Sequence, residues 1–264
     1  AEYNPMECIK TNVLGTENVV KASIDANVSH ALLISSDKAV SSINLYGSTK
    51  SLAEKLFVNA NNLIGNRDLR FSVARYGNVA GSEGSVLQLY NYLYSNKKKL
   101  PLTDKNMTRF WITIDQCIKF IFGCFSRMQG GEIFIPKLPS IRIKDLIKTF
   151  EKEYEIIGMQ GNEKIDEIMF SLEESRKIIE FNNFFILPPL LEFFIGRISG
   201  KDKNITQKII KNKFMKTNFN EVGKKLKKQY RYSSGSNKFL TVKEISKINN
   251  KIINSIEKKE FLFY

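Results

Sequence analysis

The sequence predicts an α/β fold with a doubly wound parallel sheet and a smaller C-terminal substrate region. Short apolar runs, typical of buried parallel strands, alternate with segments of helical periodicity in the first half of the chain. Polar residues with reactive groups follow the first of these runs, at the edge where such sheets bind ligands. The apolar runs are His30–Ser35, Arg70–Tyr76 and Glu132–Pro136.

Helices are expected between these strands. Asn4 followed by Pro5 is typical of a helix start, and apolar residues then keep a helical period as far as Asn27. Beyond Pro136 the alternation of strands and helices loosens. The expected helices are 5–27, 46–62, 85–95, 114–127, 141–154 and 170–181, with an extended segment over 109–112, packed core over 184–195 and a Lys/Asn/Ile-rich stretch over 198–229.

Positive charge is concentrated in the last quarter of the chain. The 264 residues carry a net charge of +14, of which +12 falls in residues 201–264 and +2 in residues 1–200. The run Lys224–Lys228, followed by Tyr230–Tyr232, has the composition of a nucleic-acid or anionic-membrane binding module. We favour a solvated helix here, so nucleic acid is not an expected partner.

Cysteine and histidine are too scarce for a disulfide framework or a metal site. The chain has 3 cysteines without a zinc-binding spacing, and His30 is its single histidine. A multi-histidine metal centre is therefore excluded, and we expect no bound metal.

The most apolar stretch is too short to span a bilayer. It covers Phe184–Ile195 and is interrupted by Pro188, Pro189 and Glu192. The sequence also lacks a signal peptide. We expect no membrane span and a cytoplasmic location.

Tyr46 and Lys50 form a Tyr-x-x-x-Lys pattern in an expected helix. Residues four apart share a helix face, so the Lys50 ammonium is expected beside the Tyr46 phenol, lowering its pKa from about 10. Such a phenol can accept a proton from a sugar hydroxyl while hydride passes to a nicotinamide. The pattern alone is weak, because Tyr94 and Lys98 have the same spacing.

Three polar residues at the end of the first expected strand strengthen this interpretation. Ser36, Asp37 and Lys38 follow the apolar run directly, and the helix that carries Tyr46 and Lys50 comes next. Ligands of doubly wound sheets bind at the carboxyl ends of the strands. These five side chains are therefore expected to converge on one crevice.

Seven short motifs, taken in order, resemble one enzyme family. The chain resembles the inverting UDP-N-acetylglucosamine 4,6-dehydratases, members of the extended short-chain dehydrogenase/reductase superfamily. The resemblance covers residues 1 to about 190 and returns near 230–245. The motifs are Ser35–Ala39, Asn44–Lys50, Arg75–Val79, Met107–Ile112, Gly131–Lys137, Glu163–Lys164 and Tyr232–Ser234.

The resemblance implies a Rossmann-like fold and an NADP-dependent lyase reaction, with NAD as the alternative cofactor. Tyr46 would be the base that oxidises the 4-hydroxyl, and Lys50 would lower its pKa and hold the nicotinamide ribose. Asp37 and Lys38 would be the acid/base pair that eliminates water across C5 and C6. Hydride would then return to C6, and C5 would be reprotonated with inversion.

The same resemblance implies the binding residues and the partners. Ser36 and Val79 would join Tyr46 and Lys50 in cofactor binding, and the Ser36 hydroxyl could also bond the sugar. Asn78, Thr103, Arg109 and Glu163 would contact the UDP-sugar substrate. The implied partners are this substrate and further copies of the chain in a homo-oligomer, and the implied role is surface-glycan or flagellin-sugar biosynthesis.

The sequence departs from the family pattern in four places. It has no G-x-x-G-x-x-G turn for the cofactor pyrophosphate, so residues 1–136 are expected to form an incomplete dinucleotide-binding domain without the first βαβ units. Residues 137–264 are expected to form the substrate-binding region, with a Lys-rich C-terminal part. Glu83 and Gln160 replace arginines and Asp166 replaces histidine, so weaker substrate binding and impaired activity are expected.

Three alternatives remain open from the residues alone. A sugar-nucleotide 4-epimerase needs Tyr46 and Lys50 but no elimination at C6. A non-catalytic remnant or a basic binding module would need neither. The choice between NADP and NAD, the exact sugar, the oligomeric state and the role of residues 201–264 are not determined by the sequence.

Overall fold

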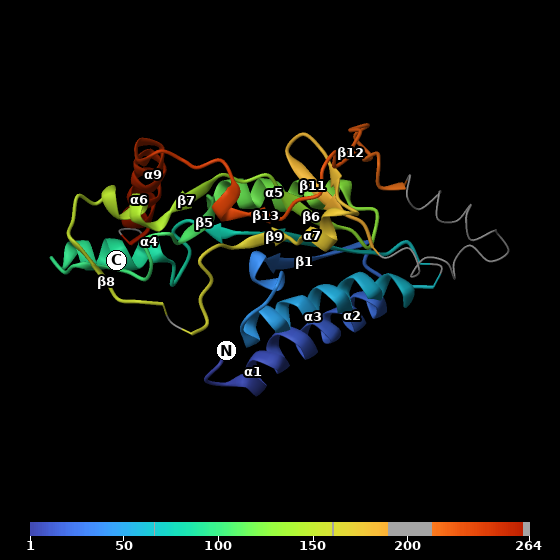
Figure 1. Ribbon diagram of the computed structural model, residues 1–264. Helices are drawn as coiled ribbons and strands as arrows, with labels where there is room; N and C mark the ends of the chain where they lie inside the picture. Colours follow the sequence, from blue (N-terminus) through green and yellow to red (C-terminus); the bar gives the residue numbers. More distant parts are fainter. Residues whose placement is uncertain (66, 160, 190–212, 261–264) are drawn as a thin grey trace. The chain divides into compact units, whose positions relative to one another are not determined.

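The computed structural model describes residues 1–65, 67–159, 161–189 and 213–260 (Figure 1). The chain folds into two compact units whose segments alternate along the sequence. The expected division at residue 136 assigns a function to each side and stays a prediction. Unit 1 comprises Ala1–Tyr76, Phe120–Lys137 and Ile168–Arg231, and unit 2 comprises Gly77–Lys119, Leu138–Glu167 and Tyr232–Tyr264.

Unit 1 is built on a sheet of 6 strands in the order β1-β2-β6-β11-β10-β12. The three expected strands are parallel neighbours, and the remaining three add in antiparallel fashion. The α/β class is confirmed, and the sheet is mixed. The strands are β1 (His30–Ser36), β2 (Arg70–Tyr76), β6 (Ile133–Pro136), β11 (Phe184–Leu187), β10 (Ile179–Glu180) and β12 (Lys224–Lys225).

Helices cover both faces of this sheet. Helix α3 (Leu45–Asn59) packs on β1 and β2 with α2 (Gly15–Asp25) at its side, as Figure 1 shows. Phe57 of α3 meets Phe71 of β2 edge to face. Strand side chains alternate between faces, so Ala74 points the other way, into a core with Cys124 of α5 (Ile114–Arg127). Arg75, two residues from Val73 and four from Phe71, therefore lies on the α3 face.

The N-terminal helix is interrupted once. Helix α1 (Pro5–Ile9) continues through a π-helical turn at Lys10–Leu14 into α2. Short 3₁₀ turns follow β1 at Asp37–Ala39 and α3 at Ala60–Asn62.

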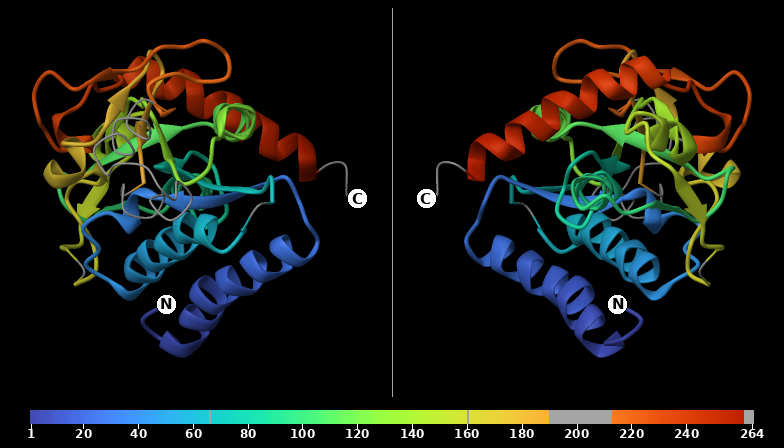
Figure 2. Two further views of the ribbon diagram at one scale, coloured as in Figure 1. Left: turned by 90° about the vertical axis from the view of Figure 1, so that its right-hand side faces the viewer. Right: turned by 90° about the vertical axis from the view of Figure 1, so that its left-hand side faces the viewer.

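Unit 2 has its own core. Its strands β3 (Asn78–Val79), β5 (Thr108–Ile112) and β7 (Ser140–Arg142) form a sheet of 3, and β4 (Leu100–Leu102) pairs with β8 (Tyr154–Ile156). The long helix α9 (Val242–Glu260), which the sequence analysis does not anticipate, packs on α6 (Ile143–Lys148) (Figure 2). The core includes residues from these elements and from α4 (Val86–Ser95), among them Tyr90, Trp111, Ile141, Leu146 and Ile245.

Two expected helices are wrong. Segment 141–154 contains only the short α6 between β7 and β8, and segment 170–181 begins at the last residue of β9 (Ile168–Phe170) and contains α7 (Leu172–Ser175) and β10. Strands of two or three residues are too short to show a period of 2, so their apolar residues imitate a helical pattern. A Ser171/Glu174 capping box starts α7, and the chain enters β10 soon afterwards.

The Lys-rich run is also not helical. Lys224–Lys225 form the edge strand β12, and both side chains are exposed. An edge strand needs no apolar face, and lysine there discourages pairing with another sheet. Of the expected core over 184–195, residues 184–187 form β11, while residues 190–195 lie outside the described residues, as do residues 198–212 of the stretch 198–229.

Within the described ranges, no helix combines the length and the apolar run needed to cross a bilayer. The same residues contain no cluster of three His, Cys, Asp or Glu side chains that could hold a metal ion. The remaining short elements of unit 2 are β13 (Tyr232–Ser233) and a 3₁₀ turn at Ser234–Ser236.

Candidate active site

The carboxyl end of β1 leads straight into the turn that carries Asp37 and Lys38. Ser36 caps this turn: its Oγ accepts from the Lys38 backbone N–H at 3.3 Å and donates to Asp37 Oδ1 at 2.8 Å. Lys38 Nζ donates to the same Oδ1 at 3.2 Å. Asp37 is 0% exposed, and its Oδ2 has no hydrogen-bond partner among the described residues. A buried acid with one oxygen unused is thus held beside an ammonium.

Tyr46 and Lys50 lie on the first two turns of α3. Asn44 starts this helix, because its side chain accepts from the Gly47 backbone N–H at 2.8 Å. Tyr46 is 38% exposed, whereas Lys50 is partly buried and donates from Nζ to the Ile34 carbonyl at 2.7 Å. The lysine is therefore bound to the strand next to the Asp37 turn.

Gly47 brings the helix start against that turn. A Cβ at this position would overlap the Lys38 carbonyl oxygen and lie 2.9 Å from Ser42 Cβ. Only a residue without a side chain permits so close an approach. The glycine between Tyr46 and Ser48 thus explains how the phenol and the Asp37–Lys38 pair come to share one neighbourhood.

The electrostatics of Tyr46 correct one expectation. Burial raises the pKa of the Tyr46 phenol, Lys38 opposes this effect, and Asp37 and Cys8 add to it. The cation that favours the phenolate is thus Lys38 and not Lys50, whose ammonium lies on the Ile34 carbonyl. The expectation that the pKa of Tyr46 is lowered is wrong, because the cost of burying the anion is the largest effect.

Lys50 lines a second cavity, of about 370 Å³, that bears on cofactor binding. The cavity is also lined by Asn12 and Thr16 of the α1–α2 segment and by Leu32–Ile34 of β1. An ammonium and neutral hydroxyl and amide groups suit the hydroxyls of a ribose. The residues present fit the nicotinamide ribose of a dinucleotide, and the sequence offers no glycine-rich loop for its pyrophosphate.

The residues expected to bind substrate all belong to unit 2. Asn78 and Val79 form β3, and the buried Asn78 Oδ1 has no hydrogen-bond partner in the described part of the chain. The Arg109 side chain is largely buried, and its Nη1 donates to the carbonyls of Thr108 at 2.6 Å and Ile165 at 3.1 Å. Its Nε lies 3.8 Å from Glu167 Oε1. Thr103 and Glu163 are partly buried.

Asp166, which departs from the family pattern, has a structural contact. Thr108 Oγ1 donates to Asp166 Oδ1 at 2.8 Å and also lies 2.7 Å from Ser234 Oγ. Gly235 leaves room for this carboxylate, because a Cβ there would overlap it. The sequence analysis misses this network, although Thr108 and Ser234 both lie in the quoted motifs.

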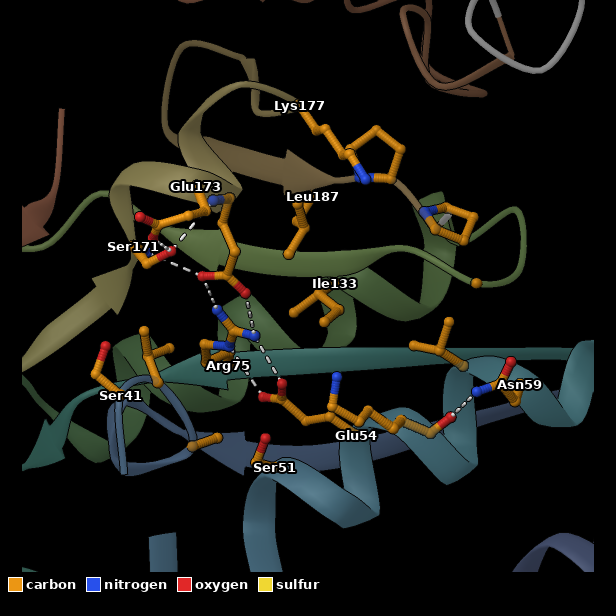
Figure 3. Close-up of a pocket in the computed structure, with 18 residues that line it drawn as sticks. Ser41, Ser51, Glu54, Asn59, Arg75, Ile133, Ser171, Glu173, Lys177 and Leu187 are labelled. Atoms are coloured by element: carbon orange, nitrogen blue, oxygen red, sulfur yellow. Dashed lines mark hydrogen bonds and ion pairs between the residues drawn. The ribbon is translucent and has the colours of Figure 1, made fainter. Parts of the chain in front are cut away.

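A buried ion-pair cluster behind the site was also missed. Arg75 of β2 is 3% exposed and lies between Glu54 of α3 and Glu174 of α7, as Figure 3 shows for Glu54. The cluster forms the floor of a cavity of about 630 Å³. A charged residue inside the apolar run Arg70–Tyr76 is the signal that could have revealed it, since a buried guanidinium needs partners.

A Rossmann-type α/β sheet with a Tyr-x-x-x-Lys helix beside a polar strand end defines a short-chain dehydrogenase/reductase fold. The profile of the polysaccharide biosynthesis protein family matches residues 1–189, and the chain belongs to this family.

Individual proteins with similar sequences or structures agree with this assignment. The chain is 44% identical over 254 residues to a UDP-N-acetylglucosamine 4,6-dehydratase (inverting) of Campylobacter jejuni, covering 95% of the chain and 72% of the relative. A UDP-glucose 4-epimerase of Rickettsia rickettsii is 31% identical over 94% of the chain and 69% of that protein. The X-ray structure of Pen from Bacillus thuringiensis superposes with a TM-score of 0.78 at 30% identity, covering 96% of the chain and 70% of Pen. The resemblance that the motifs indicate is confirmed.

Proposed function

We propose that the chain is a UDP-N-acetylglucosamine 4,6-dehydratase that inverts C5. The observation that carries this proposal is the Asp37–Lys38 pair held against Tyr46 in a chain 44% identical to the Campylobacter enzyme. Oxidation needs one base, and elimination needs a further acid and base. The three groups are present within one strand-end neighbourhood of unit 1.

Tyr46 is the proposed base at the 4-hydroxyl. Its phenolate accepts the hydroxyl proton, and the Lys38 ammonium stabilises that phenolate against the cost of burial. A nicotinamide dinucleotide, when bound, supplies hydride acceptance at C4 and hydride return at C6. Lys50, Ser36 and Val79 are the residues proposed to hold it, and NADP is proposed over NAD.

Asp37 and Lys38 are proposed to eliminate water from the 4-keto sugar. The ketone acidifies C5–H, so a carboxylate can take this proton while the electron pair forms the C5–C6 double bond. The C6–O bond breaks, and the Lys38 ammonium donates a proton to the departing hydroxide. The unused Oδ2 is the oxygen of Asp37 available as base. A proton delivered later to the opposite face of C5 gives the inverted product.

Four residues of unit 2 are proposed to bind the UDP-sugar: Asn78, Thr103, Arg109 and Glu163. The unpartnered Asn78 Oδ1 supports a ligand contact there. Arg109 uses Nη1 on two carbonyls, so a diphosphate oxygen would be bound through Nη2. A homo-oligomer and a cytoplasmic location complete the proposal.

The proposal is tested by incubating the chain with UDP-N-acetylglucosamine and NADP and recording proton NMR spectra. A new C6 methyl signal is expected in the wild type, and it is expected to form about 10²-fold more slowly in Asp37→Asn. The Tyr94→Phe variant is the matched control, because Tyr94 has the same spacing to a lysine outside the site. The absence of any methyl product from wild-type protein would contradict the proposal.

A 4-epimerase is the second candidate, because the Rickettsia relative shares 31% identity over 94% of the chain. Epimerisation uses Tyr46 but does not remove the C6 hydroxyl. The same NMR experiment separates the two functions, since a changed C4 proton without a methyl signal identifies the epimerase. An activity below that of relatives is expected in either case, because Glu83 and Gln160 replace arginines.

A further inference from the structure

Glu54 joins three elements directly behind the proposed catalytic groups. It lies on α3, one turn after Lys50 and two turns after Tyr46, and is 4% exposed. Glu54 Oε1 accepts from Ser35 Oγ at 2.7 Å and from Arg75 Nε at 2.9 Å, and Oε2 accepts from Arg75 Nη2 at 2.6 Å. Helix α3 is thereby bound to β1 and to β2 through one carboxylate.

These contacts are made at the ends of the strands that carry the site. Ser35 and Arg75 are register partners in the parallel pair β1–β2. The next residue of β1 is Ser36, which caps the Asp37 turn, and the preceding residue, Ile34, accepts from Lys50. Successive turns of α3 therefore hold successive residues of β1. A shift of Glu54 would move the base of the Asp37–Lys38 turn.

One guanidinium does not balance the two carboxylates of the cluster. Arg75 Nη1 and Nη2 also contact Glu174, at 3.2 and 3.1 Å, so two carboxylates share one guanidinium. Two further lysines line the same cavity, Lys55 and Lys177, but both are exposed and screened by water (Figure 3). Lys50 is the partly buried cation on the same helix as Glu54.

The charge of Glu54 stabilises the protonated form of Lys50. Burial lowers the pKa of the Lys50 ammonium, and the charge of Glu54 raises it. The Ile34 carbonyl of β1, which accepts from Lys50, is uncharged, and so are Asn12 and Thr16, which line the same cavity. Tyr46, one turn earlier, has a raised pKa and is neutral near pH 7. Glu54 is thus the group that opposes loss of the Lys50 proton.

We propose that Glu54 is a positioning residue, which keeps Lys50 an ammonium fixed against β1 and holds the Asp37–Lys38 turn in place. The consequence for turnover rests on the proposed function, whereas the coupling of Glu54 to Lys50 does not. Glu54 touches no reacting atom in this scheme and acts through Lys50 and Ser35.

Glu174 offers a matched control within the same cluster. It contacts Arg75, as Glu54 does, but its other hydrogen bonds belong to the capping box of α7. It makes no hydrogen bond to Ser35 and is not among the groups that shift the pKa of Lys50. Glu54→Gln and Glu174→Gln therefore remove the same charge from Arg75, and only the first removes it from Lys50.

The coupling is measured by competitive acetylation of the folded chain across a pH series, with the Lys50 peptide quantified by mass spectrometry. Glu54→Gln is expected to raise the acetylated fraction of Lys50 at pH 8 by about threefold or more, because the unprotonated amine is the reactive form. Glu174→Gln is expected to leave it within about twofold of wild type. Equal changes in both variants, or none in Glu54→Gln, would overturn the proposal.

Activity supplies the second readout. Glu54→Gln is expected to lower kcat more than it raises KM and to move the alkaline limit of kcat to lower pH, and Glu54→Asp is expected to recover part of the loss. If Glu54→Gln does not fold, Ser35→Ala, which removes one of the three hydrogen bonds, is expected to change Lys50 in the same direction by less. If no variant and no wild type makes product, the proposed function fails while the acetylation result still decides the coupling.

Discussion

Unit 1 contains two groups of acids and cations that use similar residues in opposite ways. Every nitrogen of Arg75 donates, and both oxygens of Glu54 and of Glu174 accept. In the turn after β1, by contrast, Asp37 Oδ1 accepts twice and Oδ2 accepts from no described residue. A saturated cluster can only hold its elements together. A buried acid with an unused oxygen retains the capacity to take a proton.

The largest effect is expected from breaking the saturated cluster. Arg75→Leu leaves the buried Glu54 and the partly buried Glu174 without this cation, and the free energy of unfolding is expected to fall by about 3–5 kcal/mol. Urea unfolding followed by circular dichroism measures this loss. Arg70→Leu, which removes an arginine whose acid partner is exposed, is the control and is expected to cost less than about 1 kcal/mol. Equal losses would show that the cluster is not structural.

Replacing Asp37, the acid with an unused oxygen, should lower the rate of the reaction and not the stability of the fold. Asp37→Asn keeps the shape of the side chain, so we expect the rate of product formation to fall about 10²-fold, equivalent to about 2.7 kcal/mol of transition-state stabilisation. Unfolding should change little. The rate of C6 methyl formation and the urea midpoint are measured on the same preparation. If Asp37→Asn lowers stability but leaves the rate unchanged, Asp37 stabilises the fold and does not take part in the reaction.

Gly47→Ala tests whether the Asp37–Lys38 turn depends on its close packing against α3. The added methyl would meet the Lys38 carbonyl oxygen, so either the helix start or the turn must move. We expect a loss of about 2 kcal/mol in unfolding free energy, together with a slower reaction. Gly123→Ala in α5, where the nearest atom is the end of the flexible Arg127 side chain, is the matched control. If Gly47→Ala changes neither the unfolding free energy nor the reaction rate, the Asp37–Lys38 turn can move without affecting either, and the prediction is contradicted.

Glu132 extends the comparison to a buried acid whose Oε2 has no hydrogen-bond partner among the described residues. Burial raises its pKa above the ordinary 4.5, so between these two pKa values the folded chain holds a proton that the unfolded chain releases. The stability due to this proton is complete below about pH 4.5 and is lost as pH rises through the raised pKa. Glu132→Gln imitates the protonated acid, so it is expected to be more stable than wild type by about 1 kcal/mol at pH 8 and equal to it at pH 4.

Glu221 is the control for Glu132, because its pKa is lowered and not raised. Hydrogen bonds from Arg127 lower the pKa of Glu221, so its contribution is present at neutral pH and is lost as pH falls through the lowered pKa. Glu221→Gln should therefore weaken the fold at pH 8. Urea unfolding at pH 4 and pH 8 compares the two variants, and a loss of stability in Glu132→Gln at pH 8 would contradict the assignment.

The difference between the two groups also marks what the sequence can predict. Residues near in sequence, such as Ser36, Asp37, Lys38, Tyr46 and Lys50, could be placed together because a strand end and the following helix meet at one edge. Glu54, Arg75 and Glu174 are separated by 21 and 99 residues, so only the register of β1 with β2 and the position of α7 bring them together.

Local energetics escaped prediction for a related reason. The pattern places Lys50 beside Tyr46, but whether the ammonium acts on the phenol depends on which acceptor it finds, and here that acceptor is the Ile34 carbonyl. The strands β9 and β10 were missed because two or three residues carry no readable period, even though β10 pairs with the nearby β11. The long strands of the first half were predicted from their continuous apolar runs, and the long helices from apolar residues that recur at the helical period over several turns.

The contact at Gly47 has a consequence for motion. Because not even a methyl group fits between the start of α3 and the Lys38 carbonyl, neither part can tilt or slide without carrying the other. Any opening of this end of the sheet would displace the phenol, the carboxylate and the amine as one block. Substrate exchange would then have to be timed by segments other than these three groups.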